Sequence, residues 1–241
     1  MVTEGRDGRA PSPRHRRRGI AVATLAVLVV ALVVGLAARR PPHERPAAAP
    51  SPTFADTTVP FPDKTASDVV SYSDHVVLVT AVAEREVPAS PAPSTAASGE
   101  RTIPREVTFR VDATLWSRPD APTAPAQFTA VWAGWVVTNG KRTPFAIQGT
   151  PWVFVGGQYV MPIAYDGTAF TPIQPYAVFR YVDDAVAPET QDTPLTHDLA
   201  MASRGKVAAV FANAVADPLA VRYGDLLPRA RLGAVIAARK P

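Results

Sequence analysis

The chain has 241 residues, with 25 Lys and Arg, 21 Asp and Glu, no cysteine, and a net charge of +4 at pH 7. The absence of cysteine excludes thiol catalysis, Cys-ligated zinc and cysteine-bound iron–sulfur clusters. Residues 1–45 hold nine Arg and three acidic residues, a net charge of +6, whereas residues 46–241 hold sixteen basic and eighteen acidic residues, a net charge of −2. Because the basic excess is absent from the bulk of the chain, we expect no nucleic-acid partner.

Residues 19–38 read GIAVATLAVLVVALVVGLAA and contain no charged side chain. As a helix this run spans about 30 Å, the thickness of the hydrocarbon core of a bilayer. We interpret it as a single transmembrane helix. A cleaved signal peptide is an alternative, although such peptides have shorter apolar cores of about 7–15 residues. A buried soluble helix is another, but an apolar surface all round would need a large protein to cover it.

The flanking arginines predict the orientation of this helix. Residues 1–18 carry six Arg against two acidic residues, and fewer basic residues follow residue 38. An excess of Arg and Lys favours the cytoplasmic side. We therefore expect residues 1–18 to form a basic cytoplasmic tail and the rest of the chain to lie outside the cell membrane.

Proline-rich sequence follows the apolar run. Residues 39–62 contain PPHERPAAAPSPTFADTTVPFP, and proline at this density favours an extended, semi-rigid spacer. Residues 88–99 (PASPAPSTAASG) have nothing to bury and predict a mobile loop.

Residues 63–190 carry the pattern of an extracytoplasmic β-rich domain. After a possible short helix at 65–72, residues 75–87 are apolar on both faces in their first half, and residues 106–116 alternate between apolar and polar side chains. Asn139-Gly140 and Asp166-Gly167 are strong hairpin signals. Further strands are expected at 127–137, 141–148, 157–164, 168–173 and 176–182. Short strands joined by hairpins predict a small antiparallel barrel or sandwich.

Three stretches carry a family resemblance: VVLVTAVAEREV, EVTFRVDATLW and GGQYVMPI. A long first strand, an inserted loop and then hairpins resemble the OB-like barrels of exported bacterial proteins. The chain is thus similar to uncharacterised bacterial single-pass membrane proteins with an exported OB-like β-barrel domain. The resemblance covers about half of the chain and implies a fold, with no activity attached.

Residues 191–241 predict a helical extension. Val207, Val210, Phe211, Ala214 and Val215 form one helical stripe within residues 206–216. Asp217-Pro218 is a helix start, with Asp as the N-cap. We expect Pro228 to break this helix, and a short amphipathic turn to follow at 232–236. Residues 199–241 hold seven basic and two acidic residues, so the extension covers the domain or meets an anionic surface.

No residue pattern identifies an enzyme. Ser73-Asp74-His75 has the residue types of a catalytic triad, but adjacent residues cannot form one, and His75 is expected to begin a strand. His197 lies near a helix start, where helix capping is the ordinary role, and Asp183-Asp184 lies in a turn. We expect no catalytic residue, no metal site and no cofactor.

The tryptophans are the remaining candidates for ligand contact. Trp132 and Trp135 lie three residues apart, so a regular strand would point them to opposite faces, whereas a bulge at Gly134 would place both on one face. We expect a membrane-tethered binding module that engages a membrane or secreted protein. The alternatives are a glycan or lipid binder that uses Trp132 and Trp135, and a hydrolase of envelope polymers.

Overall fold

The computed structural model describes residues 53–55, 61–87, 101–188 and 191–240. The expected cytoplasmic tail, the apolar run at 19–38, most of the proline-rich spacer and the loop at 88–99 lie outside these residues. None of the helices within the described ranges is both long and apolar enough to span a bilayer.

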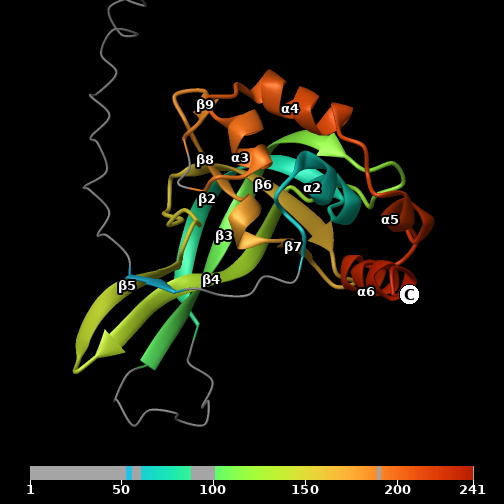
Figure 1. Cartoon of the computed structure of the whole chain (residues 1–241). Coiled ribbons are helices and arrows are strands. Elements are labelled where there is room, and N and C mark those ends of the chain that lie inside the picture. Colours follow the sequence, from blue (N-terminus) through green and yellow to red (C-terminus); the bar gives the residue numbers. More distant parts are fainter. Residues whose placement is uncertain (1–52, 56–60, 88–100, 189–190, 241) are drawn as a thin grey trace, which may run out of the picture. The chain divides into compact units, whose positions relative to one another are not determined.

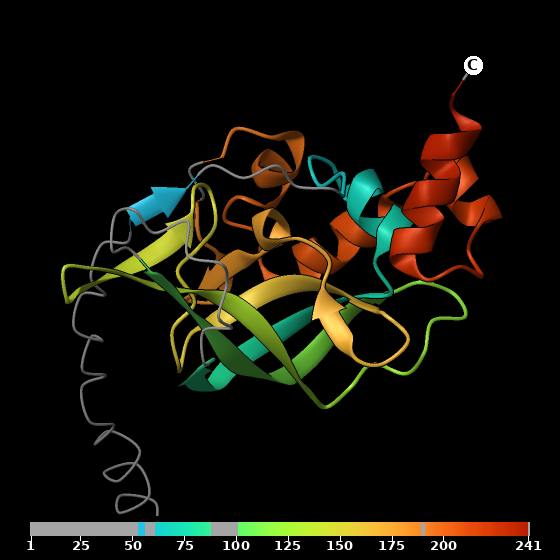
Figure 2. The same ribbon diagram turned by 90° about the horizontal axis from the view of Figure 1, so that it is seen from below.

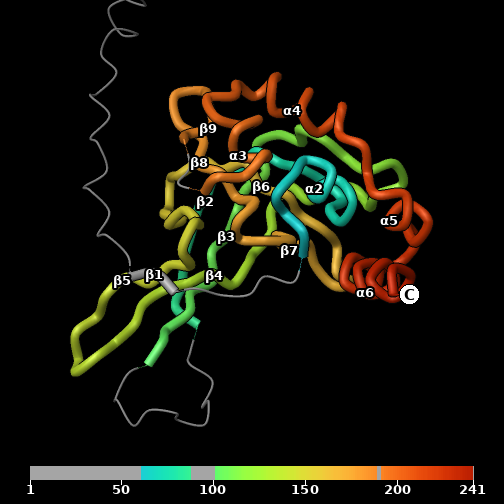
Figure 3. Tube along the Cα trace, in the orientation of Figure 1, coloured from blue at the N-terminus to red at the C-terminus, as the bar shows by residue number. Residues whose placement is uncertain are grey.

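The domain is mainly β, and its strands form one strongly curled, mostly antiparallel sheet, a half-barrel (Figures 1 and 2). The sheet order is β1-β5-β4-β3-β2-β6-β8-β9, and β7 pairs with β6 off this path. β1 lies beside β5 in the single parallel pairing of the described strands (Figure 3). The strands are β1 (Thr53–Ala55), β2 (His75–Glu86), β3 (Arg101–Ser117), β4 (Gln127–Thr138), β5 (Lys141–Ile147), β6 (Gln158–Tyr165), β7 (Phe170–Pro172), β8 (Phe179–Val182) and β9 (Ala185–Val186).

Local turn chemistry places the hairpins where the sequence predicts them. Asn139 and Gly140 both have positive φ, 52° and 76°, and connect β4 to β5. This backbone conformation matches the right-handed twist of the paired strands. Gly167, with φ of 99°, lies in the turn between β6 and β7. The strand expected at 176–182 is shorter, because a 3₁₀ turn, η1 (Pro175–Ala177), precedes β8.

The sheet is buried on both faces at its centre. Alternate residues of β2 enter two separate cores: Val76 and Leu78 pack against helices, whereas Val77 and Val79 point into the concave face. This explains why the first half of β2 is apolar at every position. The concave core also contains aromatic residues of β3 and β4, with the rings of Phe109 and Phe128 stacked at 5.3 Å.

Five helices accompany the sheet: α2 (Ala66–Tyr72), α3 (Pro194–Leu199), α4 (Arg204–Asn213), α5 (Pro218–Arg222) and α6 (Pro228–Ala238). Leu195, Leu199, Val207 and Phe211 of α3 and α4 are buried against β2, β6 and β8. α2 shares a smaller cluster with α5 and α6, formed by Phe61, Tyr72, Ala220 and Val235. The C-terminal helices therefore belong to the same compact unit as the sheet.

Two expectations for the C-terminal helices are wrong in detail. α4 ends at Asn213, so Val215 lies outside the helix and is 78% exposed. Pro228 starts an eleven-residue helix instead of leading into a short turn, because proline lacks only an N–H that the first helical turn does not use. The N-cap expected at Asp217 is confirmed, since its carboxylate accepts a hydrogen bond from the N–H of Leu219 at 2.9 Å.

Candidate functional site

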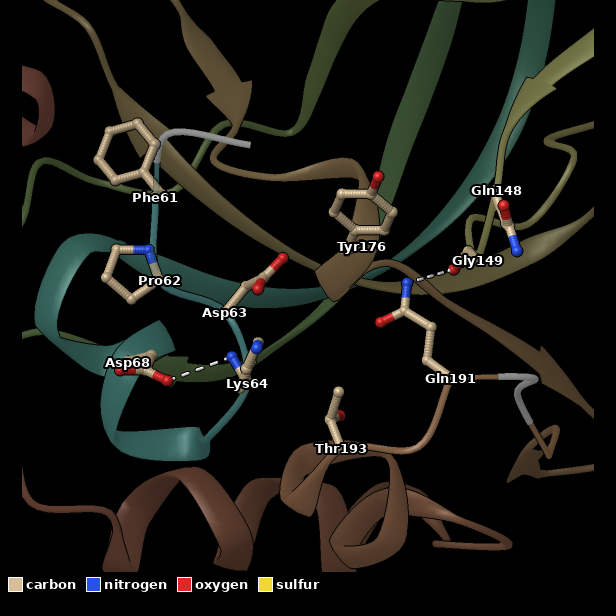
Figure 4. A pocket seen from close by; sticks show the side chains of 10 residues that line it. All are labelled: Phe61, Pro62, Asp63, Lys64, Asp68, Gln148, Gly149, Tyr176, Gln191 and Thr193. Carbon is tan, nitrogen blue, oxygen red and sulfur yellow. Dashed lines mark hydrogen bonds between the residues drawn. The ribbon is translucent and has the colours of Figure 1, made fainter. Parts of the chain in front are cut away.

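The strongest candidate for a ligand site is a polar cleft of about 750 Å³ (Figure 4). It lies between the segment that leads into α2, the turn after β5, η1 and the start of α3. This volume falls in the range of small-molecule pockets. Its lining residues are Phe61, Pro62, Asp63, Lys64, Asp68, Gln148, Gly149, Tyr176, Gln191 and Thr193.

Helix capping fixes one wall of the cleft. The hydroxyl of Thr65 accepts a hydrogen bond from the N–H of Asp68 at 3.0 Å, and the Asp68 carboxylate accepts one from the N–H of Thr65 at 2.9 Å. The same carboxylate oxygen also accepts from the N–H of Lys64 at 3.1 Å. This reciprocal capping box holds the segment that presents Asp63.

A glycine and a glutamine fix the opposite wall. The side-chain amide of Gln191 donates to the carbonyl oxygen of Gly149 at 2.7 Å. Gly149 has φ of +78°, which favours glycine, and a Cβ there would lie 2.4 Å from the Nε2 atom of Gln191 and displace that side chain. Among the described residues, the amide oxygen of Gln191 accepts no hydrogen bond that could occupy it. It remains available as an acceptor in the cleft.

Asp63 is the chemically unusual group of the cleft. Its Oδ2 atom is buried and has no hydrogen-bond partner among the described residues. Burial raises the pKa of this carboxyl, the nearby Asp68 raises it further, and Lys64 opposes the effect. Figure 4 shows the carboxyl pointing into the space between Tyr176 and Gln191. A perturbed carboxyl in a concave site is a recognised mark of function.

Of the two arrangements that the sequence allows for Trp132 and Trp135, the structure has the bulge at Gly134. Trp132 pairs with Arg105 and Trp135 pairs with Ile103, so two residues of β4 lie opposite the single residue between them on β3. A Cβ on Gly134 would lie 2.1 Å from the carbonyl oxygen of Ile103, which no other residue could accommodate without a backbone shift. Paired positions share a face, so both tryptophans lie on the concave side.

The two tryptophans have different surroundings. Trp132 is 8% exposed and packs edge-on against Phe109 in the concave core, with ring centroids 6.1 Å apart. Trp135 is half-buried and carries the guanidinium of Arg142 over its ring at 3.6 Å. Ligand contact at this pair stays a prediction, and the burial of Trp132 favours the cleft as the ligand site.

A buried arginine extends the cluster around Trp135. Arg105 is 1% exposed, its guanidinium lies 3.9 Å from the ring centre of Trp152, and it donates to Glu84 at 2.5 Å and to the carbonyl oxygen of Ala133 at 2.8 Å. Burial lowers the pKa of Arg105, and Glu84 opposes this effect. These contacts pin the bulge, which indicates a structural role.

His75 begins β2 as expected and is buried at 3% exposure. One ring nitrogen, Nε2, lies 2.7 Å from the carbonyl oxygen of Pro122, and the other, Nδ1, lies 2.9 Å from the hydroxyl of Ser117. Because a carbonyl only accepts, Nε2 carries the proton and Nδ1 accepts from Ser117. The partner is thus Ser117, 42 residues away, and not the adjacent Ser73. Neither His75 nor Ser117 lines the 750 Å³ cleft.

The remaining polar candidates are structural. His197 lies within α3, which Thr193 caps, and its ring contacts Asp192 at 2.5 Å on the surface. Asp183 and Asp184 have positive φ and form the turn between β8 and β9. Within the part of the chain that the structure describes, no group of three His, Asp or Glu is placed to hold a metal ion.

No protein-family model matches the chain, and no curated protein or solved structure is significantly similar to it.

Proposed function

We propose that this protein is a membrane-tethered, extracytoplasmic binding module without catalytic activity. The support for the tether is the uncharged run at residues 19–38 with its arginine-rich N-terminal flank. Residues 39–52, which precede β1, would then act as a spacer between the bilayer and the domain. The OB-like resemblance belongs to this proposal: β2 pairs with both β3 and β6 in a curled sheet, an arrangement compatible with a partly open barrel.

The ligand that fits the cleft is a neutral, polyhydroxylated molecule, such as a segment of an envelope glycan. The observation that carries this proposal is the buried, unpartnered Oδ2 atom of Asp63 in the cleft. Buried polar atoms are normally hydrogen-bonded, and a rotation of the Asp63 side chain toward the cleft would let one ligand hydroxyl donate to Oδ2 while a second donates to the amide oxygen of Gln191. The ring of Tyr176 forms an aromatic wall beside them (Figure 4).

The same geometry argues against hydrolysis of the bound ligand. A two-carboxylate mechanism needs an acid on one side of the scissile bond and a base or nucleophile on the other. Asp68 is the second carboxylate of the cleft, and its Oδ2 atom accepts two backbone N–H groups of the capping box. Asp63 therefore lacks a catalytic partner among the residues that line the cleft.

Titration calorimetry of the full chain in nonionic detergent, with soluble envelope-glycan fragments, tests this proposal. Asp63→Asn keeps the shape of the side chain and removes its charge, whereas Asp63→Ala removes every hydrogen bond to the ligand. We expect the alanine variant to bind about 10–100-fold more weakly, the effect of one lost hydrogen bond to a polar or charged group. Asp120→Asn is the matched control, because Asp120 is exposed and lies outside the cleft.

A protein partner is the alternative ligand class. Affinity purification of the full chain from solubilised membranes tests it. A stoichiometric protein that still binds the Asp63→Ala variant, together with no saturable glycan binding, would replace the cleft proposal.

A further inference from the structure

Exposed apolar side chains concentrate in the C-terminal helices. Of the nine large apolar residues that are exposed in the described part of the chain, five lie between residues 215 and 236. They are Val215, Val221, Leu226, Leu227 and Ile236. Figures 1 and 2 both place α5 and α6 beside each other, at the end of the domain away from β5. We call α5, α6 and the loop between them the α5–α6 face.

Three of these residues share one groove. Val221, Leu226 and Leu227 line a cavity of about 700 Å³ whose walls include the apolar Trp116 and Pro122 and also the charged Arg118, Asp120, Asp225 and Arg231. The three exposed apolar side chains therefore share one groove of mixed polarity and are not isolated from one another.

The charge around the apolar residues is basic. Arg222, Arg229 and Lys240 are exposed and form no ion pair within the described residues. Asp217 is neutralised by its ion pair with Arg239, whereas Asp225 and Asp120 line the groove and Arg229 lies near enough to Asp166 to help lower the pKa of that carboxyl. Residues 217–240 hold five basic and two acidic residues, a net charge of +3, whereas residues 46–198 carry −7. The α5–α6 face is thus a basic part of a chain region that is otherwise acidic.

We propose that the α5–α6 face docks on the surface of an anionic bilayer. Apolar side chains that enter the headgroup boundary, surrounded by Arg and Lys that meet anionic lipids, are the two elements of interfacial binding. This proposal depends on the proposed membrane anchor only because the anchor would hold the domain close to the bilayer. The 14 residues from 39 to 52, which precede β1, can span at most about 50 Å, so the tether lets the domain reach the bilayer in more than one orientation.

The absence of cysteine makes a site-specific test simple. Val221→Cys and Val131→Cys each introduce one labelling site, at positions that are 65% and 64% exposed. The full chain carrying an environment-sensitive dye at either site is reconstituted in nanodiscs of phosphatidylcholine alone or with 30% (about one lipid in three) phosphatidylglycerol. Quenching by nitroxide-labelled lipids then reports the distance of each dye from the bilayer.

We expect lipid quenching at residue 221, only in the anionic nanodiscs, and little at residue 131. Each basic residue near an anionic surface contributes about a fivefold preference, so the triple variant Arg222→Gln, Arg229→Gln, Lys240→Gln should lower the docked-to-undocked ratio by about a hundredfold. Equal quenching at both sites, or quenching that ignores lipid charge and survives the triple substitution, would overturn the proposal. Dye–dye contact at residue 221 between two chains, without lipid quenching, would assign the face to a protein interface instead.

Failure of the anchor and failure of the docking face give different results. Extraction of the chain from membranes by alkaline carbonate would show that residues 19–38 do not span the bilayer. The labelled soluble chain, mixed with preformed vesicles of the same two compositions, then tests the α5–α6 face alone. Glycan binding in the cleft is independent of both measurements.

Discussion

Tyr159→Phe tests the packing of the concave core, because its effect on the free energy of unfolding should differ between pH 7 and pH 12. Tyr159 is fully buried, its hydroxyl accepts a hydrogen bond from the N–H of Phe154 at 3.0 Å, and burial raises its pKa to about 12. Tyr159→Phe removes the acceptor and leaves the Phe154 N–H without this partner. At pH 7 we expect the free energy of unfolding to fall by about 1–3 kcal/mol.

The alkaline behaviour follows from linkage. The folded-state pKa of Tyr159 lies above the ordinary tyrosine value of 10, so the unfolded chain loses this proton first as the pH rises. The contribution is fully present below pH 10 and is lost between pH 10 and 12, by about 2.7 kcal/mol for a difference of about two units. The phenylalanine variant lacks this titration, so its disadvantage at pH 7 should shrink or reverse near pH 12.

Urea unfolding of the full chain in nonionic detergent, followed by tryptophan fluorescence between pH 7 and 11.5, measures both effects. Other groups titrate in both proteins, and their contributions cancel in the difference between wild type and variant. If the difference in unfolding free energy between wild type and variant stays constant from pH 7 to 11.5, Tyr159 has the same pKa in the folded and unfolded states and is not desolvated by folding. If the variant is as stable as the wild type at pH 7, the hydrogen bond from the Phe154 N–H to the Tyr159 hydroxyl does not stabilise the fold.

Three further predictions concern single groups. Asp63→Asn should raise the free energy of unfolding at pH 7, because a carboxyl with a raised pKa loses stability as the pH rises from about 3.8 through its folded-state pKa. Thermal unfolding of both proteins over a series of pH values measures this effect. A variant with the same pH dependence as the wild type would contradict it. Gly134→Ala should cost about 2–3 kcal/mol or more, since its Cβ meets the Ile103 carbonyl oxygen, whereas Gly233→Ala in open space on α6 should stabilise by about 0.5–1 kcal/mol in the same urea assay. Although Ser117 forms a hydrogen bond with His75, it should react with a fluorophosphonate probe no faster than free serine does. Selective labelling of Ser117, detected by mass spectrometry, would instead support the hydrolase alternative.

Local sequence rules predict much of this fold because the signals act over short distances. The alternation at 106–116 becomes β3, and Asn139-Gly140 and Asp166-Gly167 become hairpin turns. The bulge at Gly134 follows from a glycine between two tryptophans at odd spacing. What the same rules misjudge is the extent of elements: β3 begins at Arg101, five residues before the predicted start, because pairing with β4 extends it beyond the clear alternation.

The candidate site could not be read from the sequence because it is assembled over long distances. Gln191 bonds Gly149 across 42 residues, and Asp63 shares the cleft with residues more than 100 positions later. Each of these residues is ordinary in its local context: Asp63 precedes a helix cap, and Gln191 lies in a polar connection between Pro188 and Pro194. The sequence could have drawn attention to Thr65 and Asp68, whose spacing is that of a capping box, but not to the unpartnered carboxyl beside them.

The buried charged side chains of the domain and its exposed ones lie in different places and have different roles. Its buried cations are committed to the fold: Arg105 holds the bulge, and Arg231 donates to the carbonyl oxygens of Ser71, Gly224 and Leu226. Neither cation is therefore offered to a ligand. The buried polar atoms that lack a partner among the described residues are Asp63 Oδ2 at the cleft, Arg105 Nη2 and Arg231 Nε, so the cleft is where such an atom is an acceptor. The exposed Arg222, Arg229 and Lys240 lie on the α5–α6 face. Because the cleft presents hydrogen-bond acceptors and the face presents cations beside apolar side chains, the two surfaces select chemically different targets. If the proposed tether, the cleft ligand and the docking face all hold, the protein would bind a polar ligand while it rests on the membrane, and the two surfaces would not compete.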